Sequence, residues 1–220
     1  MDQRTFDEFV AERATAMLRT AYLLTGDRGS ARDLLQTALI AADRHRDRFA
    51  DPAEATAFVR RELVAEHTSW RRWLRLGDLL SESPVMAGAA GFPGFPARRP
   101  ADPGPQDEFS APLAQLPPRV RAALVLRYAE GASGADTAAA LGRPIEEVAI
   151  DTARGLDRLG TDGARLGRVL TERAQSTTAV PDEVRASTRE GAQAQRNHRL
   201  ALLVLAAVLI AIALIVVVTV

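Results

Sequence analysis

The pattern of apolar and polar positions predicts helices along the first third of the chain. Apolar residues recur at helical spacing from about residue 4 to 25, and the polar stretch TGDRGS ends that pattern. Ser30, followed three residues later by Asp33, resembles a capping box and predicts a second helix through about Arg46. The residues expected on the buried face of that helix are Leu34, Leu35, Ala38 and Leu39.

A third helix is predicted from about residue 53 to 75. Asp51 followed by Pro52 is a strong start signal, because the acid can cap the helix and proline fits its first position. The end of this helix, WRRWLR, is basic. Between Arg60 and Arg75 five arginines stand against two glutamates, so the net charge of this stretch is plus three.

Residues 77–110 interrupt the helical pattern. They contain six prolines and five glycines, which predicts a flexible linker between two small helical units. Helical spacing returns from Leu113 to Leu159, with a glycine turn at Gly142. A short helix, a glycine turn and a second helix are the layout of a helix-turn-helix unit. Residues 161–199 are polar and are predicted to form a tether.

The last stretch, Leu200 to Val220, is apolar and carries no charge. Its 21 residues match the length that crosses a bilayer core of roughly 30 Å, so we expect a transmembrane helix here, and a buried helix is the alternative. RNHR, Arg196 to Arg199, directly precedes it, and the positive-inside rule then places residues 1–199 in the cytoplasm. The sequence therefore predicts a single-pass protein of the inner membrane, either tail-anchored or part of a longer protein with an outer portion.

Composition narrows the class of function. The 220 residues are 47% hydrophobic and 5% aromatic, which favours helices over strands. The absence of cysteine excludes disulfides and zinc–thiolate sites. Three histidines far apart in sequence, without a glycine-rich phosphate loop, argue against an enzyme, and no cofactor is implied. Because the formal net charge is zero, binding to nucleic acid must come from local basic patches.

Two stretches resemble the small bacterial sigma factors of the extracytoplasmic-function group. AYLLTGDRGSARDLLQTAL, followed by FVRRELV and SWRR, resembles their region 2. LPPRVRAALVLRYAEGASGADTAAALG resembles the start of their region 4, and the two stretches together cover about 120 of the 220 residues in the expected order. The resemblance implies an all-α fold and a protein that binds core RNA polymerase and directs promoter-specific transcription initiation.

The predicted organisation has five parts. They are a region 2-like helical domain (1–76), the flexible linker (77–110), a region 4-like helix-turn-helix domain (111–160), the polar tether (161–199) and the transmembrane helix (200–220).

The resemblance also assigns residues to the region 2-like part. Asp33 and Gln36, in the DLLQ run, match positions that dock on core polymerase, although a polar helix face would have the same pattern. In the family the third helix contacts the −10 promoter element and captures unstacked bases. Ala65 stands where family members often have asparagine, and Glu66 adds a negative charge. Arginines neutralise phosphates and tryptophan stacks on bases, and the matching positions here are Arg60, Arg61, Trp70, Arg71 and Arg72.

The segment that would read the −35 promoter element departs from the family. RPIEEVAIDTARGLDRL, residues 143–159, has four acids against three arginines, and the lysine and arginine usual in the family are Ala149 and Asp151. Carboxylates lose the counterion-release gain beside phosphates, but they accept hydrogen bonds from cytosine N4. We therefore expect −35 recognition to be weak or altered. The residues predicted to face DNA are Arg143, Glu146, Glu147, Ile150, Asp151 and Arg154.

Two hypotheses follow. The first is a membrane-tethered sigma factor whose partners are core RNA polymerase, promoter DNA, the membrane through Leu200 to Val220, and an anti-sigma factor or releasing protease. The second is a degenerate sigma-like regulator that acts through protein contacts, with altered or lost −35 recognition.

Overall fold

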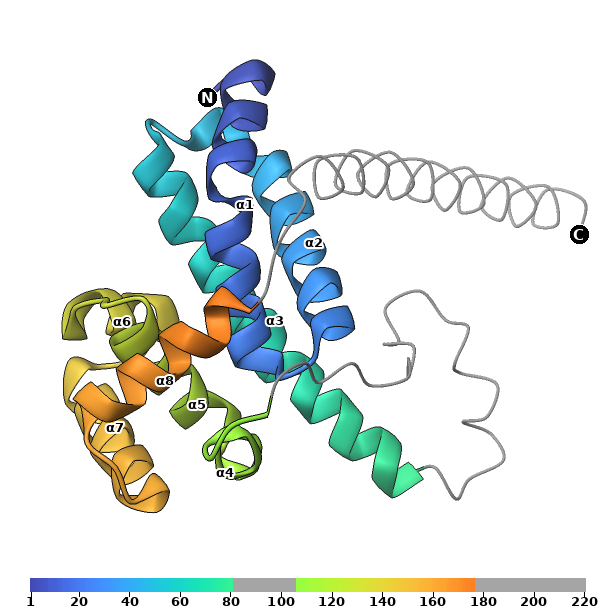
Figure 1. Cartoon of the computed structure of the whole chain (residues 1–220). Helices are drawn as coiled ribbons and strands as arrows, with labels where there is room; N and C mark the ends of the chain where they lie inside the picture. The colour runs from blue at the N-terminus through green and yellow to red at the C-terminus, as the bar shows by residue number, and fades with distance from the viewer. Residues whose placement is uncertain (81–105, 177–220) are drawn as a thin grey trace, which may run out of the picture.

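The computed structural model describes residues 1–80 and 106–176, with the backbone alone for residues 70–80. The N-terminal unit consists of α1 (Gln3–Thr25), α2 (Arg28–His45), the 3-10 turn η1 (Arg46–Arg48) and α3 (Pro52–Leu80). Helices α1 and α2 pack against each other and against the first part of α3, and the C-terminal end of α3 extends beyond them (Figure 1). Their apolar faces form the buried interior of this unit, as the helical spacing predicts.

Aspartates cap each of these helices at its N-terminus. The carboxylate of Asp2 accepts a hydrogen bond from the Thr5 backbone N–H at 2.8 Å, and that of Asp51 accepts from the N–H groups of Ala53 and Glu54. The start of the third helix at Asp51-Pro52 is thereby confirmed. A carboxylate at this position satisfies backbone donors that have no partner within the helix.

The predicted start of the second helix is wrong by about one turn. Asp27, rather than Ser30, is the cap, and its carboxylate accepts from the Ser30 N–H at 2.7 Å. Gly26 ends α1 in a left-handed conformation, with φ of 76°, so the chain turns directly from one helix into the next. The predicted buried face of Leu34, Leu35, Ala38 and Leu39 is confirmed.

The C-terminal unit begins with three short elements: α4 (Ser110–Gln115), α5 (Pro118–Leu124) and the π-helical turn η3 (Val125–Ala129). Helices α6 (Gly134–Leu141) and α7 (Ile145–Leu159) follow, joined through Gly142, which is left-handed with φ of 60°. This is the predicted helix-turn-helix. Val148 and Thr152 of α7 are buried, so the apolar side of α7 faces the preceding helices.

Helix α8 (Gly163–Gln175) falls in the stretch predicted to be a tether, so that prediction is wrong for these residues. Leu166 and Leu170 are fully buried, and α8 packs on both η3 and α1. A Cβ atom at Gly167 would stand 2.9 Å from the carbonyl oxygen of Tyr128, so the close approach of α8 to η3 requires a glycine there.

The two units share one buried core. A single cluster of buried apolar residues extends from α1 to α8, and α5, α6 and α8 pack on α3 or α1 (Figure 1). The side chain of Arg121 is buried at this junction, where its Nε donates to the carbonyl oxygen of Leu23 at 3.0 Å. The predicted linker lies mainly in residues 81–105, outside the described residues.

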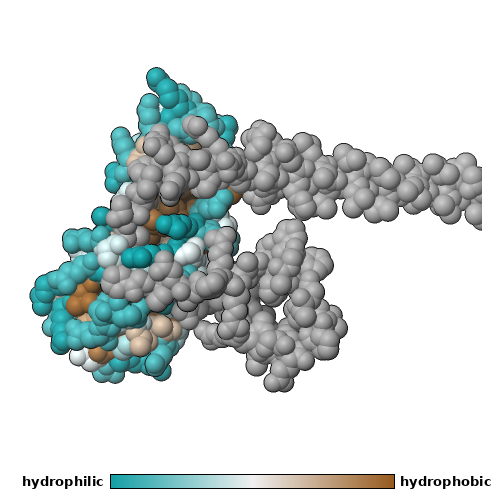
Figure 2. All heavy atoms as spheres, turned by 45° about the vertical axis from the view of Figure 1, so that its right-hand side comes forward, coloured by the Kyte–Doolittle hydropathy of each residue, from teal (hydrophilic) through white to brown (hydrophobic). Residues whose placement is uncertain are grey.

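The transmembrane part of the predicted fold class, and with it the predicted location in the inner membrane, is corrected. No helix in residues 1–80 and 106–176 is long and apolar enough to span a bilayer. The apolar stretch at 200–220 on which that prediction rested lies outside the described residues. On the face shown in Figure 2, hydrophilic residues dominate the described surface and hydrophobic ones form small patches. The fold class is therefore all-α, without an assigned membrane span.

Replacing Asp107 by asparagine is expected to lower the free energy of unfolding by about 1–2 kcal/mol at neutral pH. Asp107 pairs with Arg173 of α8, whose side chain is only 4% exposed, and the substitution would leave that cation buried without its counter-charge. Asp107 itself is 25% exposed, which limits the effect. Chemical denaturation of the two proteins measures the difference.

The effect of Asp107→Asn should depend on pH. Burial acts to raise the pKa of Asp107, but the hydrogen bonds and charge of Arg173 outweigh it and hold that pKa below its ordinary value of 3.8. The stabilisation is therefore complete above that value and is lost as the pH falls through the lowered pKa. A difference in unfolding free energy that did not shrink in acid would contradict this account.

Candidate polymerase and promoter interfaces

Asp33 and Gln36 lie one turn apart on α2, and both are half-buried. Both make contacts within the protein, and the backbone carbonyl of Asp33 accepts a hydrogen bond from the Thr37 hydroxyl at 3.0 Å. Leu34 and Leu35 point into the core between them. The two polar side chains therefore stand on the side of α2 that does not form the core, partly open to a partner.

Arg60 and Arg61 are neighbours on α3 with different surroundings. The Arg61 side chain is exposed, with its guanidinium carbon 5.6 Å from the centre of the Phe58 ring. Arg60 is half-buried, and its Nε donates to the carboxylate of Glu130 at 2.7 Å. The other three predicted promoter residues, Trp70, Arg71 and Arg72, lie on the part of α3 whose side chains are outside the described residues.

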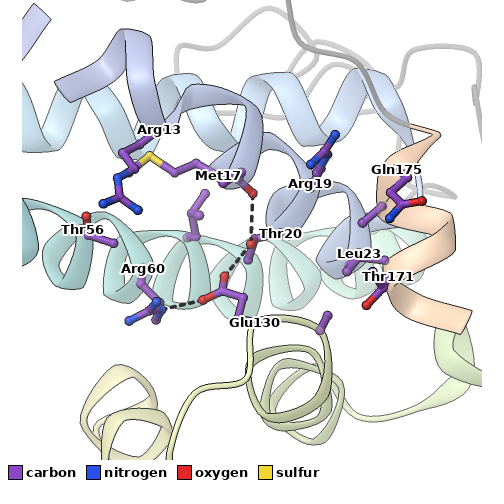
Figure 3. Close-up of a pocket in the computed structure, with 14 residues that line it drawn as sticks. Arg13, Met17, Arg19, Thr20, Leu23, Thr56, Arg60, Glu130, Thr171 and Gln175 are labelled. Carbon is purple, nitrogen blue, oxygen red and sulfur yellow. Dashed lines mark hydrogen bonds and ion pairs between the residues drawn. The ribbon is translucent and has the colours of Figure 1, made fainter. Parts of the chain in front are cut away.

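A cleft of about 370 Å³ lies between the two units, and Arg60 is one of its lining residues. Glu130 and Thr20 lie near its centre with Arg60 beside them, and the Thr20 hydroxyl donates to the second carboxylate oxygen of Glu130 (Figure 3). Arg13 and Thr56 lie toward one end of the cleft, and Arg19 and Gln175 lie toward the other (Figure 3). Three arginines from the N-terminal unit thus line the cleft, and one of them, Arg60, contacts the carboxylate of Glu130 from the C-terminal unit.

The helix-turn-helix is held by local capping and by close packing. Ser133 and Asp136 form a capping pair at the start of α6, where the Ser133 hydroxyl donates to the Asp136 carboxylate at 2.7 Å. The hydrogen bonds with Ser133, and the positive charge of Arg60, lower the pKa of Asp136. Gly155 lets α7 approach α5, because a Cβ there would stand 2.8 Å from Leu124 Cδ1. These contacts fix the direction in which α7 presents its outer side chains.

The outer face of α7 combines acids with arginines. Arg143 and Glu147 form an ion pair one turn apart, and Glu146 and Ile150 are exposed. A hollow of about 550 Å³ lies between α7 and the start of α5. Its charged lining consists of Arg119, Arg143, Asp151, Arg154, Asp157 and Arg158. Four arginines against two aspartates make this hollow positive, although the segment 143–159 is net negative.

Two residues that were not predicted from the sequence, Arg119 and Glu130, also lie at these sites. Arg119, at the exposed start of α5, lines the same hollow as Arg154, and only the fold brings them together. Glu130 had no signal beyond an acid at the end of a helix, because its partner Arg60 is 70 residues away in the chain. Of the predicted −35 residues, Arg143, Asp151 and Arg154 share one hollow.

Glu66 lies on α3 one turn beyond Glu62. Burial, with the charge of Glu62 as a smaller cause, raises the pKa of the Glu66 carboxyl. The fold therefore disfavours a negative charge at this position of the predicted promoter helix. Within the described residues, no group of three or more histidine and acidic side chains could hold a metal ion.

Comparison with known families and proteins gives one consistent result. Residues 107–159 match the family described as Sigma-70, region 4. The RNA polymerase sigma-E factor of Streptomyces avermitilis is 34% identical over 158 residues, which are 70% of this chain and 82% of the relative. The RNA polymerase sigma-E factor of Streptomyces coelicolor is also 34% identical over 158 residues, with 70% and 83% covered.

A solved structure is similar as well. It is the sigma factor RpoE of Bartonella quintana, crystallised with the anti-sigma factor NepR. The TM-score is 0.51 and the sequence identity 28%, and the match covers 74% of this chain and 98% of that chain.

Proposed function

We propose that this chain, which belongs to the extracytoplasmic-function group of RNA polymerase sigma factors, directs promoter-specific transcription initiation through the two interfaces described above. As a member of that family it is an initiation factor and not an enzyme. The observation that carries the proposal is the 34% identity over 158 residues, which are 70% of this chain, together with the helix-turn-helix at α6 and α7.

In this proposal, α2 docks on core RNA polymerase through Asp33 and Gln36. Their partly exposed position outside the core of α2 supports the role. On α3, Arg60 and Arg61 contact the −10 element together with Trp70, Arg71 and Arg72. Arg61 is exposed and available to a phosphate, whereas Arg60 must first leave Glu130.

The C-terminal unit would place α7 at the −35 element. The arginine-lined hollow beside α7 supports binding to phosphates, which positions the unit on the duplex. Glu146 and Ile150 would then face base edges, where a carboxylate accepts from cytosine N4 and an isoleucine contacts a thymine methyl group. Glu147, tied to Arg143, would orient that arginine rather than repel the backbone.

An anti-sigma factor is a further proposed partner. The Bartonella relative was crystallised with an anti-sigma factor, and its match extends over 74% of this chain. A partner of that class would bind one or both units and compete with polymerase.

Glu147→Ala is expected to change which promoters this chain selects, with about a tenfold change in relative use of the affected promoters. The substitution removes the ion-pair partner of Arg143, so that Arg143 can donate to a guanine, and it also removes an acid from the recognition helix. The measurement is in vitro transcription of a genomic fragment library by core polymerase with the wild-type chain or the variant, read by sequencing transcript starts. Glu12→Ala, on the exposed surface of α1, is the matched control.

The proposal fails if the wild-type chain with core polymerase yields no discrete starts. A second candidate, a sigma-like regulator with lost −35 recognition, is favoured by the excess of acids on α7. It predicts saturable binding to polymerase with no promoter-dependent transcript for either the wild type or Glu147→Ala.

A further inference from the structure

One charged contact between the two units involves a residue assigned to promoter binding. Arg60 Nε donates to Glu130 Oε2 at 2.7 Å, with side chains that are 26% and 19% exposed. A guanidinium recognises a carboxylate and a phosphate by the same paired geometry. Glu130 therefore accepts from a donor of Arg60, the Nε–H group, that could otherwise donate to a DNA phosphate.

Glu130 is held there from a second side. The Thr20 hydroxyl donates to Glu130 Oε1 and also lies 3.3 Å from the Ala16 carbonyl oxygen. Thr20 is on α1 and Arg60 is on α3, so one carboxylate from the C-terminal unit joins two helices of the N-terminal unit (Figure 3). We call these three residues, Thr20, Arg60 and Glu130, the inter-unit clasp.

Two helices of the C-terminal unit also pack on the helix that carries Arg60. Helices α5 and α6 both pack on α3, the helix predicted to contact the −10 element. Asp136 of α6 has its pKa lowered mainly by its hydrogen bonds with Ser133, and the charge of Arg60 contributes in the same direction.

The surface beside the clasp is suited to a nucleic-acid backbone. Arg13 and Arg19, both on α1, line the same cleft as Arg60, and the Nε of Arg19 is shielded from solvent without a hydrogen-bond partner in the described part of the chain. Removal of Glu130 would leave three arginines along the cleft with no carboxylate among its lining residues. Such a row of cations attracts an anionic strand.

Two further contacts keep the units closed. Buried Arg121 donates to the Leu23 carbonyl oxygen, and α8 packs on both α1 and η3. Helix α8 lies C-terminal to residues 107–159, the part that matches sigma-70 region 4, so it adds a contact outside the matched region.

We propose that Glu130 is an intramolecular competitor for Arg60, and that the inter-unit clasp keeps the promoter helix covered in the free chain. The inference rests on the proposed promoter role of Arg60 and deepens it. Binding of core polymerase would separate the units, release Arg60 from Glu130 and expose α3 to DNA. Before it binds polymerase, the chain would therefore bind DNA only weakly through α3.

Glu130→Gln, which keeps the size of the side chain but removes its charge, tests this in the full-length protein. The probe is a labelled single-stranded DNA of random sequence, about 16 nucleotides long, read by fluorescence anisotropy. Affinity for the probe is expected to rise about three- to tenfold. This is the effect of one charge-assisted hydrogen bond that Arg60 can make to DNA once Glu130 no longer competes for it. Thr20→Val, which removes only the second hydrogen bond, should raise it in the same direction.

Two controls separate the clasp from general charge effects. Glu8→Gln removes the same charge from the exposed surface of α1, where Glu8 pairs with Arg4, and should leave affinity unchanged. Arg60→Gln in the Glu130→Gln background should abolish the gain. Because the chain has no cysteine, Asp47→Cys and Ala153→Cys can carry a dye pair, and energy transfer between the units should fall in Glu130→Gln and when core polymerase is added.

The outcomes are distinguishable from failure of the proposed function. Unchanged DNA affinity and unchanged energy transfer in both Glu130→Gln and Thr20→Val would overturn the clasp, even if the wild-type chain supports transcription. Opening without a gain in DNA affinity would overturn the competition with DNA. Absence of transcription with core polymerase would instead overturn the proposed function.

Discussion

Replacing Arg121 by alanine is expected to lower the free energy of unfolding by about 3 kcal/mol. The Arg121 side chain is 1% exposed, and its Nε donates to the carbonyl of Leu23 in the last turn of α1. Carbonyls in a last turn have no partner within the helix, and the negative end of the helix dipole favours a cation. The substitution leaves a buried carbonyl without its donor and a cavity between the units.

Arg119→Ala is the matched control for this prediction. Arg119 is two residues earlier on the same helix and exposed, so its loss should change stability by no more than about 0.5 kcal/mol. Denaturant titration followed by circular dichroism measures both variants. Equal stabilities for Arg121→Ala and wild type would show that the junction between the units contributes nothing to folding.

The double substitution Asp33→Ala and Gln36→Ala is expected to weaken binding to core RNA polymerase about 30-fold, equivalent to about 2 kcal/mol. Both side chains project from the side of α2 that does not form the core, and both offer hydrogen-bonding groups to a partner. Binding is measured by titrating labelled chain with core polymerase. The fold should persist, because the buried face of α2 is untouched.

Arg32→Ala and Thr37→Ala, at exposed positions beside them on α2, are the controls and should bind within about twofold of wild type, as most residues near an interface do. If the double variant binds as tightly as these controls, Asp33 and Gln36 are ordinary surface residues. The polymerase-docking site then lies elsewhere on the chain.

The sequence predicted the helices best where their signals were local. The Asp51-Pro52 start is confirmed because both the cap and the first residue of α3 act within one turn. The start of α2 was misplaced because Gly26 ends α1 so abruptly that Asp27 becomes the cap ahead of Ser30. Two capping signals only three residues apart cannot be ranked without the preceding turn.

Elements that depend on distant partners could not be predicted. Helix α8 has a narrow apolar stripe, and its buried Arg173 is acceptable only because Asp107 pairs with it from 66 residues away. The role of Glu130 also depends on distant partners, because Thr20 and Arg60 are the residues that hold its carboxylate. The shared core of the two units likewise follows from tertiary packing, which periodicity does not encode.

Binding of the full-length chain to bacterial core RNA polymerase tests the central claim most directly. Labelled chain would be titrated with core polymerase and followed by fluorescence anisotropy. The control is holoenzyme, in which another sigma factor already occupies the binding site on the polymerase. The account predicts saturable binding to core polymerase and little binding to that holoenzyme, because sigma factors compete for one site. Absence of saturable binding to core polymerase would contradict the account.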